Sequence, residues 1–529
     1  MTHDFLSGRR GVTLAREAMV ATSHPLATAS GLRILAEGGS AADAAVAACA
    51  VQCVVDPLMT GIGGDCFALV APAGGRIQAL NGSGRAAMAA APEALLAQGL
   101  TEIPRNSPHG VTIPGAISGW SLLHRDHGRL PFARLLSDAI RYAENGYPVT
   151  PRVAWDWGRH APAIAGEPAA AAVFLPEGRA PEVASRHSQP VLGQTLRLIA
   201  REGAAGFYRG AVARSMVRFL RAAGGVQTEE DFAAAEQVAE WLEPIRAEYR
   251  GYEVLECPPN GQGIIALLIL RILEGFDLSP ATPEALRIHL HAEAAKLAYH
   301  QRDALLGDPS GCPDLVQKLL GGETVSRLRG MIDPGRASRP VPGTETPHRD
   351  TICLSVVDRD GNAVSFINSI FDAFGSCLLD PATGVLFHSR GTSFRLAEGH
   401  PNRLGPGRRP MHTIIPGMLC EKGRVIMPFG VMGGHYQAAG HAAFLSGCLD
   451  MRLDPQQAID APRSFAYDGE LQVESTIAPA VLEGLARMGH QIRIAPSPIG
   501  GAQAIRIDHH AGILIGGSDG RKDGMALGW

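Results

Sequence analysis

TICLSVVDRDGNAVSFINS, residues 351–369, decides the fold of this chain. Two apolar runs, at 352–357 and 363–367, flank a turn at 358–362 with an Asp-Gly centre, and this pattern predicts a β-hairpin. The preceding stretch, 331–350, reads MIDPGRASRPVPGTETPHRD, whose four prolines and scattered charges oppose a packed element. The sequence therefore predicts a mobile linker that ends where Thr351 opens a strand.

Thr351 at this boundary has the groups needed for nucleophilic attack on an amide. Its hydroxyl is a poor nucleophile by itself, but a free α-amino group titrates at about 7.7 to 8 and can take the hydroxyl proton. That nitrogen is an amide while the chain is intact. We therefore expect an inactive precursor, in which Thr351 attacks the carbonyl of Asp350 and the resulting ester hydrolyses. The alternative is a threonine that simply suits a strand.

The stretch that begins at Thr351 resembles the processing site of the γ-glutamyltransferase family, in which a threonine precedes a similar SVVDxDGNAV segment. Other motifs follow in the family's order along nearly the whole chain. They are EGGSAADAAVA at 37–47, TGIGGD at 60–65, GFYRG at 206–210, YRGY at 249–252, AEAAK at 292–296, FGS at 374–376, RPMHT at 409–413 and GVMGG at 430–434.

The resemblance implies an α+β fold, a four-layer αββα sandwich of the N-terminal-nucleophile hydrolases. Composition alone predicts only a mixture of helices and strands. Residues 1–350, ending in the linker 331–350, would form the large subunit of one domain, and residues 351–529 would form the small subunit. The resemblance also implies a self-cleaving zymogen that matures into a heterodimer of its own fragments, with a dimer of such pairs left open.

Family alignment assigns further catalytic roles. Gly433 and Gly434 align with the glycines whose amides form the oxyanion hole, and Ser369 aligns with a hydroxyl residue that hydrogen-bonds the nucleophile. Arg85 aligns with the arginine that grips the substrate's α-carboxylate, where a two-point guanidinium contact suits the chemistry. Without the resemblance, these residues would be interpreted as a turn, an ordinary strand serine and a surface arginine.

The substrate pocket departs from the family pattern. γ-Glutamyl enzymes hold the substrate's ammonium group with an Asp and an Asn, and these positions are Ser393 and Phe371 here. A Ser-Ser pair that braces the carboxylate becomes His412-Thr413. A buried ammonium without partners costs several kcal/mol, on the order of 3 to 5, so a glutamate head group is disfavoured.

Arg85, with Arg390, His412 and Thr413 as further substrate-binding candidates, instead suits a small anionic amide without an α-amine. Oxamate is such a compound. The alternatives are a γ-glutamyl hydrolase or transpeptidase acting on glutathione, a glutaryl or cephalosporin acylase, and an unprocessed binding protein. Hydrolysis and transfer to an acceptor are both left open.

Composition excludes several other classes. The 529 residues are 46% hydrophobic with a formal net charge of -4, and the charges are intermingled, so neither nucleic acid nor a membrane is an expected partner. The N-terminal stretch lacks a signal-peptide core, which predicts a cytoplasmic protein. Nine cysteines without CxxC spacing fit reduced thiols, and Cys353 is expected to pack in the core.

No cofactor or metal is expected. The histidines match no common ligand spacing, and GIGGD at 61–65 lacks the residues of a phosphate-binding loop. Periodicity predicts helices at 25–36, 41–54 and 285–306. Strands are expected at 67–71, 252–256, 352–357, 363–367 and 505–507.

Overall fold

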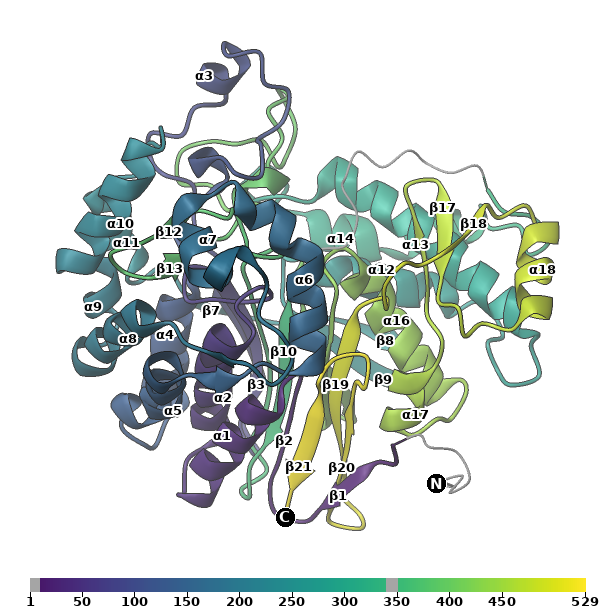
Figure 1. Cartoon of the computed structure of the whole chain (residues 1–529). Coiled ribbons are helices and arrows are strands. Elements are labelled where there is room, and N and C mark those ends of the chain that lie inside the picture. The colour runs from purple at the N-terminus through teal and green to yellow at the C-terminus, as the bar shows by residue number, and fades with distance from the viewer. Residues whose placement is uncertain (1–9, 339–350) are drawn as a thin grey trace.

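The computed structural model describes residues 10–338 and 351–529, which build two stacked seven-stranded sheets between layers of helices (Figure 1). Neighbouring strands are antiparallel in both large sheets. The first sheet has the order β1 (Thr13–Ala15), β20 (Ile513–Ser518), β19 (Gly501–Asp508), β15 (Arg424–Met432), β14 (Pro416–Glu421), β9 (Tyr252–Glu256), β8 (Ile245–Tyr249). The second has the order β21 (Met525–Gly528), β2 (Met19–Thr22), β10 (Ile352–Val357), β11 (Ala363–Ser369), β3 (Asp65–Ala71), β4 (Gln78–Gly82), β7 (Glu240–Leu242).

Three buried apolar clusters define the four layers. One cluster joins the second sheet to the helices on its outer face, another joins the first sheet to its own helices, and the third lies between the sheets. Helices α1 (Pro25–Ala36), α2 (Ala41–Val55), α4 (Ala116–His127), α5 (Phe132–Asn145) and α8 (Pro190–Glu202) belong to the first cluster. Helices α12 (Gly263–Leu273), α13 (Glu284–Leu305), α16 (Tyr436–Leu449) and α17 (Pro455–Asp460) belong to the second. The expected αββα sandwich is therefore confirmed.

The remaining elements surround this sandwich. The other helices are α3 (Pro92–Leu96), α6 (Pro151–Ala165), α7 (Pro168–Phe174), α9 (Ala205–Tyr208), α10 (Gly210–Ala222), α11 (Glu229–Ala235), α14 (Leu315–Leu320), α15 (Gly322–Arg329) and α18 (Pro479–Arg487). Short strands form three small sheets: β5 (Tyr147–Pro148) with β6 (Arg186–His187), β12 (Leu379–Asp380) with β13 (Val385–Leu386), and β16 (Ser464–Tyr467) with β17 (Glu470–Val473) and β18 (Ile492–Ile494).

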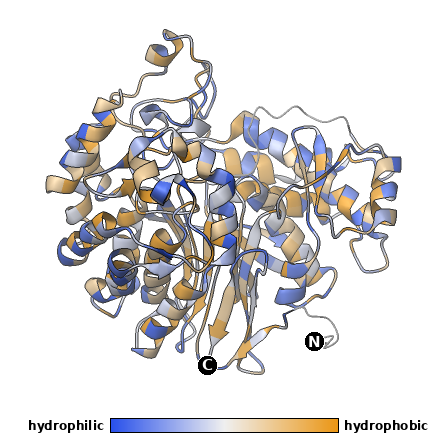
Figure 2. Ribbon diagram, viewed as in Figure 1, coloured by the Kyte–Doolittle hydropathy of each residue, from blue (hydrophilic) through white to orange (hydrophobic). Residues whose placement is uncertain are grey.

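Helix α2 shows why an alanine-rich sequence forms an interior helix here. Every residue from Ala41 to Val55 is buried, and small side chains let neighbouring elements approach closely. Ser40 caps the helix in a reciprocal box, in which its hydroxyl accepts from the Asp43 amide at 3.1 Å and the Asp43 carboxylate accepts from the Ser40 amide at 3.0 Å. Figure 2 shows the hydrophobic residues running along the strands between the helical layers.

The predicted hairpin is confirmed and lies at the centre of the second sheet. Strand β10 pairs with β11 on one side and with β2 on the other. In the turn, the Asn362 amide donates to the Asp358 carboxylate at 3.0 Å, and Gly361 adopts a φ of 85°, which a glycine tolerates without strain. Cys353 is fully buried between the sheets, as expected for a core thiol.

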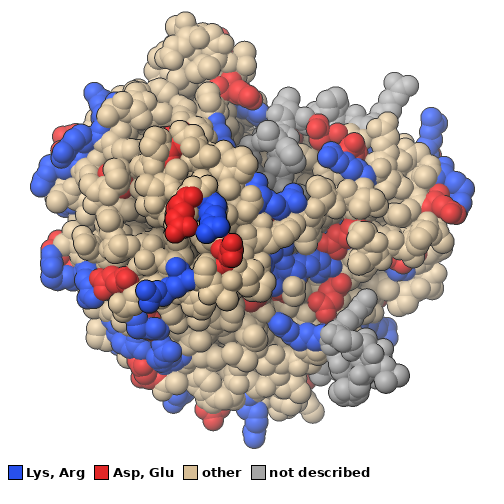
Figure 3. Space-filling model, in the orientation of Figure 1, with Lys and Arg blue, Asp and Glu red and all other residues tan. Residues whose placement is uncertain are grey.

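Among the described residues, no helix is long and apolar enough to cross a membrane. Lysine, arginine, aspartate and glutamate are interspersed on the face seen in Figure 3, without a basic stripe. Of the expected linker, residues 331–338 belong to the described chain. Residues 339–350, including Asp350, lie outside it.

Candidate active site

Thr351 lies immediately before β10, and its side chain is 1% exposed. The register of β10 with β11 brings Ser369 beside it, with the two hydroxyl oxygens 3.1 Å apart. The Phe371 amide donates to Ser369 Oγ at 2.9 Å, and Gln437 Nε2 donates to Thr351 Oγ1 at 3.5 Å. The threonine hydroxyl is therefore held by groups from two elements, β11 and α16.

The glycine pair lies between β15 and α16. Gly433 and Gly434 have φ values of 125° and 57°, in the region that favours glycine. The pair directly precedes the first turn of α16, where backbone amides are not used within the helix and can stabilise negative charge. Gln437 of that turn contacts Thr351, so the loop and the threonine hydroxyl belong to one site.

The side chain of Gln262 holds the glycine loop in place. Its Nε2 donates to the carbonyl of Gly434 at 3.0 Å and to the carbonyl of Thr413 at 2.8 Å. Arg302 Nη1 in turn donates to Gln262 Oε1 at 3.2 Å. Gln262 thus links the glycine loop to the segment that carries Thr413.

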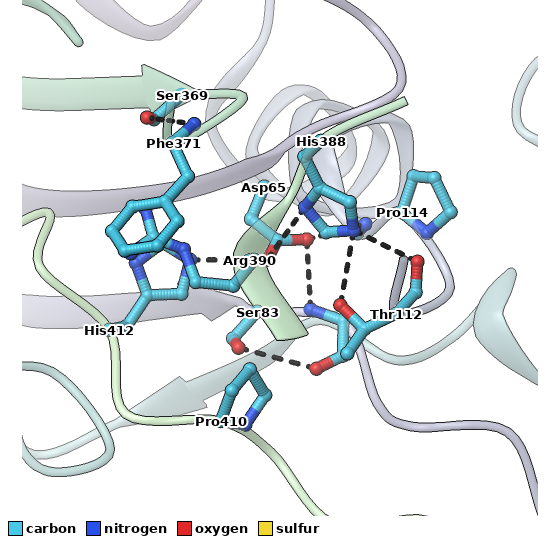
Figure 4. A network of polar contacts seen from close by, with 12 residues as sticks. Asp65, Ser83, Thr112, Pro114, Ser369, Phe371, His388, Arg390, Pro410 and His412 are labelled. Carbon is cyan, nitrogen blue, oxygen red and sulfur yellow. Dashed lines mark hydrogen bonds and ion pairs between the residues drawn. The ribbon is translucent and has the colours of Figure 1, made fainter. Parts of the chain in front are cut away.

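Arg390 is a buried cation of this site, with 1% of its surface exposed. Its Nη1 donates to Thr413 Oγ1 at 2.9 Å, and its guanidinium carbon lies 3.7 Å from the centroid of the Phe371 ring. Figure 4 shows this arginine against Phe371. Phe371 adopts a φ of 78°, which is unusual for a bulky residue and marks strained backbone. Hydrogen bonds and stacking thus join Thr351, through Ser369 and Phe371, to Arg390.

A buried carboxylate, Asp65, lies between two imidazoles next to this arrangement (Figure 4). Its Oδ2 is 3.1 Å from His412 Nε2 and 3.6 Å from His388 Nδ1. Its Oδ1 accepts from the amides of Gly84 and Gly115, each at 2.9 Å. Asp65 therefore ties together strand β3, the start of α4 and the segment around His412.

Burial and charge decide the protonation of this cluster. Burial lowers the pKa of His412 to about 3, assisted by the positive charge of Arg390. Burial also lowers the pKa of His388. Although burial by itself raises the pKa of Asp65, the two histidines and the Gly115 amide hold it at about 2. At neutral pH the imidazoles are neutral, so Arg390 rather than His412 provides the positive charge.

The other two expected substrate residues have different surroundings. Ser393 is buried and donates through Oγ to the Met411 carbonyl at 2.9 Å. Arg85 is exposed, and its Nη1 donates to the Gly407 carbonyl at 3.0 Å. The side chain of Arg85 thus bonds to the loop at 407, whereas the buried Arg390 bonds to Thr413.

Sequence reasoning missed Gln437, Gln262 and Asp65. Gln437 could have been found from its spacing, because it stands three residues after Gly434 and so falls in the first turn of the helix that the glycine pair opens. Asp65 ends the TGIGGD motif at 60–65, but the motif gave it no role, and Gln262 gave no signal. Their roles depend on contacts with residues far away in the sequence, at 412–413 and 434.

The chain is similar to several known enzymes over nearly its full length. It is 36% identical to the oxamate amidohydrolase proenzyme of Klebsiella pneumoniae, covering 97% of this chain and 98% of that protein. It is also 36% identical to the glutathione hydrolase-like YwrD proenzyme of Bacillus subtilis, covering 96% and 98%. The crystal structure of cephalosporin acylase from Bacillus halodurans superposes with a TM-score of 0.94 at 40% identity, covering 100% of this chain and 99% of that one.

Residues 27–529 match the sequence profile of the family described as Gamma-glutamyltranspeptidase. The match begins in α1 and runs to the last residue, so it includes every strand of the two large sheets except β1 and β2, and it includes the Thr351, Gly433 and Arg390 segments described above. The chain therefore belongs to the γ-glutamyltranspeptidase family, whose fold and hydrolase or transferase chemistry it shares.

Proposed function

We propose that this protein is a self-processing amide hydrolase that uses Thr351 as an N-terminal nucleophile and acts on a small carboxylate-bearing amide without an α-amine. The observation that carries the substrate class is the buried Arg390 guanidinium, stacked on Phe371 and bonded to Thr413. Phe371 and Ser393 stand where γ-glutamyl enzymes have ammonium-binding groups. The name of the Klebsiella relative, an oxamate amidohydrolase, agrees with this class.

The proposed reaction begins with Thr351 after maturation. Its freed α-amine takes the hydroxyl proton while Oγ1 attacks the amide carbonyl of the substrate. The Gly433 and Gly434 amides stabilise the negative charge that forms on the carbonyl oxygen. The proton then passes from the α-amine to the leaving nitrogen as the C–N bond breaks, which leaves an ester on Thr351. Water hydrolyses that ester and restores the enzyme.

In this proposal, Arg390 fixes the substrate by its carboxylate. A guanidinium makes a planar two-point contact with a carboxylate, and such contacts are strongest where water is excluded. His412 is neutral beside it, since burial lowers its pKa to about 3. Ser393 has no charge to attract an ammonium group. Neither His412 nor Ser393 thus offers a negative charge to an ammonium group, which favours an anion over a zwitterionic glutamyl head.

Maturation is tested first, by mass spectrometry and N-terminal sequencing of the purified protein. We expect fragments 1–350 and 351–529, with Thr351 at the new N-terminus. Thr351→Ala should remain a single inactive chain, whereas Thr351→Ser should still be cleaved because the hydroxyl is kept. A different new N-terminus, or an active uncleaved Thr351→Ala protein, would contradict the assignment of the nucleophile and would leave an unprocessed binding protein as the alternative.

Substrate class is tested on the processed protein. Ammonia release from oxamate and hydrolysis of a glutaryl amide are compared with hydrolysis of γ-glutamyl-p-nitroanilide. We expect higher kcat/KM on at least one of the two anionic amides than on the γ-glutamyl compound. The opposite preference would favour the alternative, the glutathione-hydrolase function that the name of its Bacillus subtilis relative suggests.

A further inference from the structure

Helix α13 carries a second cluster of titratable side chains, apart from the Thr351 site. His289 and Glu293 are four residues apart and so share one face of the helix, and both are almost completely buried, at 0% and 1% exposed. His490, in the turn after α18, packs against them. One ligand atom from each residue lies within 4.8 Å of the other two.

The tautomer of His289 follows from its hydrogen bonds. Its Nε2 lies 2.8 Å from the carbonyl oxygen of Asp333, and a carbonyl only accepts, so Nε2 carries the proton. Nδ1 therefore presents a lone pair to His490 Nε2, 2.8 Å away. A carbonyl that fixes the outer nitrogen of an imidazole is the usual support of a metal-binding histidine.

We propose that His289 Nδ1, His490 Nε2 and the Glu293 carboxylate bind one divalent first-row cation, with Zn²⁺ the best match to two imidazoles and one carboxylate. Such a set leaves a fourth tetrahedral position for solvent. The sequence motifs gave no hint of it, because His490 is remote from the other two residues along the chain.

The rings need only a small movement to accept the ion. Two nitrogens bound to a tetrahedral zinc at about 2.05 Å lie roughly 3.3 Å apart, so the 2.8 Å contact must open by about 0.5 Å. His490 lies in a turn and is only partly buried, which permits this shift.

The Lys296 ammonium competes with a metal ion for the Glu293 carboxylate. It lies 2.5 Å from Glu293 Oε1, and it also donates to the Ser338 carbonyl at 3.0 Å. A bound cation would displace the ammonium from Oε1, while the Ser338 contact could continue to hold the lysine. Removing the lysine should therefore strengthen metal binding.

The location suggests a structural role for the ion. Glu293 Oε2 accepts from the Ser338 amide at 3.1 Å, and His289 bonds to Asp333. The cluster thus connects α13, the turn after α18 and residues 333–338, the last described part of the chain before the expected cleavage segment. A metal here would fasten the end of that part to both elements.

The experiment uses full-length purified protein, treated with a chelator and dialysed, and titrated with ZnCl₂ in competition with a chromophoric chelator. Elemental analysis gives the stoichiometry, and Co²⁺ absorption and X-ray absorption of the wild-type Zn²⁺ complex report the ligands without any mutation. His289→Gln, Glu293→Gln and His490→Gln are compared with the control His510→Gln, which changes an exposed histidine. Circular dichroism checks that each variant folds.

We expect one Zn²⁺ per chain, with two imidazoles in the absorption spectrum. Each ligand variant should bind at least about 10- to 100-fold more weakly, the range already seen when only a supporting residue is lost, and His510→Gln should be unchanged. Lys296→Met should bind about tenfold more tightly, because one like charge near a divalent ion costs that much even at the dielectric constant of water. Absence of stoichiometric binding, binding that only His510→Gln weakens, or an unchanged Lys296→Met affinity would overturn the proposal.

Discussion

Replacing Gly433 with alanine tests the proposed oxyanion loop most directly. At a φ of 125°, Gly433 has a backbone conformation that alanine rarely adopts. An added Cβ would lie 2.9 Å from the Cα of Gly500, which is about 0.5 Å inside ordinary van der Waals contact. The Gly500 Cα is a backbone atom and a Cβ is fixed directly to the backbone of residue 433, so the loop itself must move.

A movement of that size is enough to remove one donor. Oxyanion donors act at about 2.7 to 3.1 Å from the charged oxygen, and loss of one donor typically lowers kcat by about 10² to 10³, or roughly 2.7 to 4 kcal/mol. We therefore expect Gly433→Ala to lose at least about 100-fold in kcat, with a smaller change in KM. Self-cleavage should slow as well, if the same amides stabilise attack on Asp350.

The assay measures kcat per processed active site, counted from the new Thr351 N-terminus, and the rate of fragment formation in freshly purified precursor. Gly423→Ala is the matched control, because Gly423 also has a positive φ, 75°, but nothing lies within 4 Å of its added Cβ. Gly423 lies in the turn between β14 and β15. A Gly433→Ala protein with kcat within about threefold of the control would refute the role of this loop.

Other perturbations test the substrate site and the buried histidines. Arg390→Met should lower kcat/KM on an anionic amide by about 2 to 3 kcal/mol, the cost of losing a charge-assisted contact; Arg390→Lys should recover part of it, and Arg85→Ala should have little effect. Comparable losses in the Arg85 and Arg390 variants would contradict the choice of anchor. Ser393→Asp should repel the anionic substrate and raise the ratio of kcat/KM on γ-glutamyl amides to kcat/KM on anionic amides. An unchanged ratio would show that residue 393 does not face the ammonium position. Burial lowers the pKa of both His24 and His412 to about 3. As the pH falls below about 6.5, these histidines therefore bind protons in the unfolded chain before they do so in the folded protein. Each histidine should thus lower the free energy of unfolding by about 2 kcal/mol at pH 5 relative to pH 8. Urea unfolding at the two pH values measures this, and greater stability at pH 5 would contradict it.

Local sequence patterns were sufficient for the elements that hold Thr351. The 352–357 and 363–367 runs became β10 and most of β11, because two short apolar runs around an Asp-Gly turn leave few other solutions. The expected helix at 285–306 is α13, Glu284–Leu305. In these segments the pattern of apolar residues and the boundary residues are both clear, so the local sequence alone predicts the element.

The substrate site was less predictable, because alignment places a residue along the chain but does not determine where its side chain points. Arg85 follows a glycine-rich stretch, and its guanidinium extends to the 407 carbonyl on the surface. Arg390 is buried only because Phe371 and Thr413, from two other segments, meet around it. No local pattern reports such a meeting of three segments.

The strand order has a consequence for how the mature protein is assembled. In each large sheet, strands from before residue 350 are hydrogen-bonded to strands from after it: β2 to β10 and β3 to β11 in one sheet, β9 to β14 and β1 to β20 in the other. Neither part contains a complete large sheet, so each large sheet forms only when strands from both parts come together. The proposed cut would then remove the connection that kept the two halves at high effective concentration. Refolding of the denatured mature enzyme would require two separate fragments to associate in solution. The precursor, as a single chain, needs only to fold. Self-cleavage would therefore make assembly a one-way event, and the mature enzyme would persist by slow unfolding rather than by ready refolding.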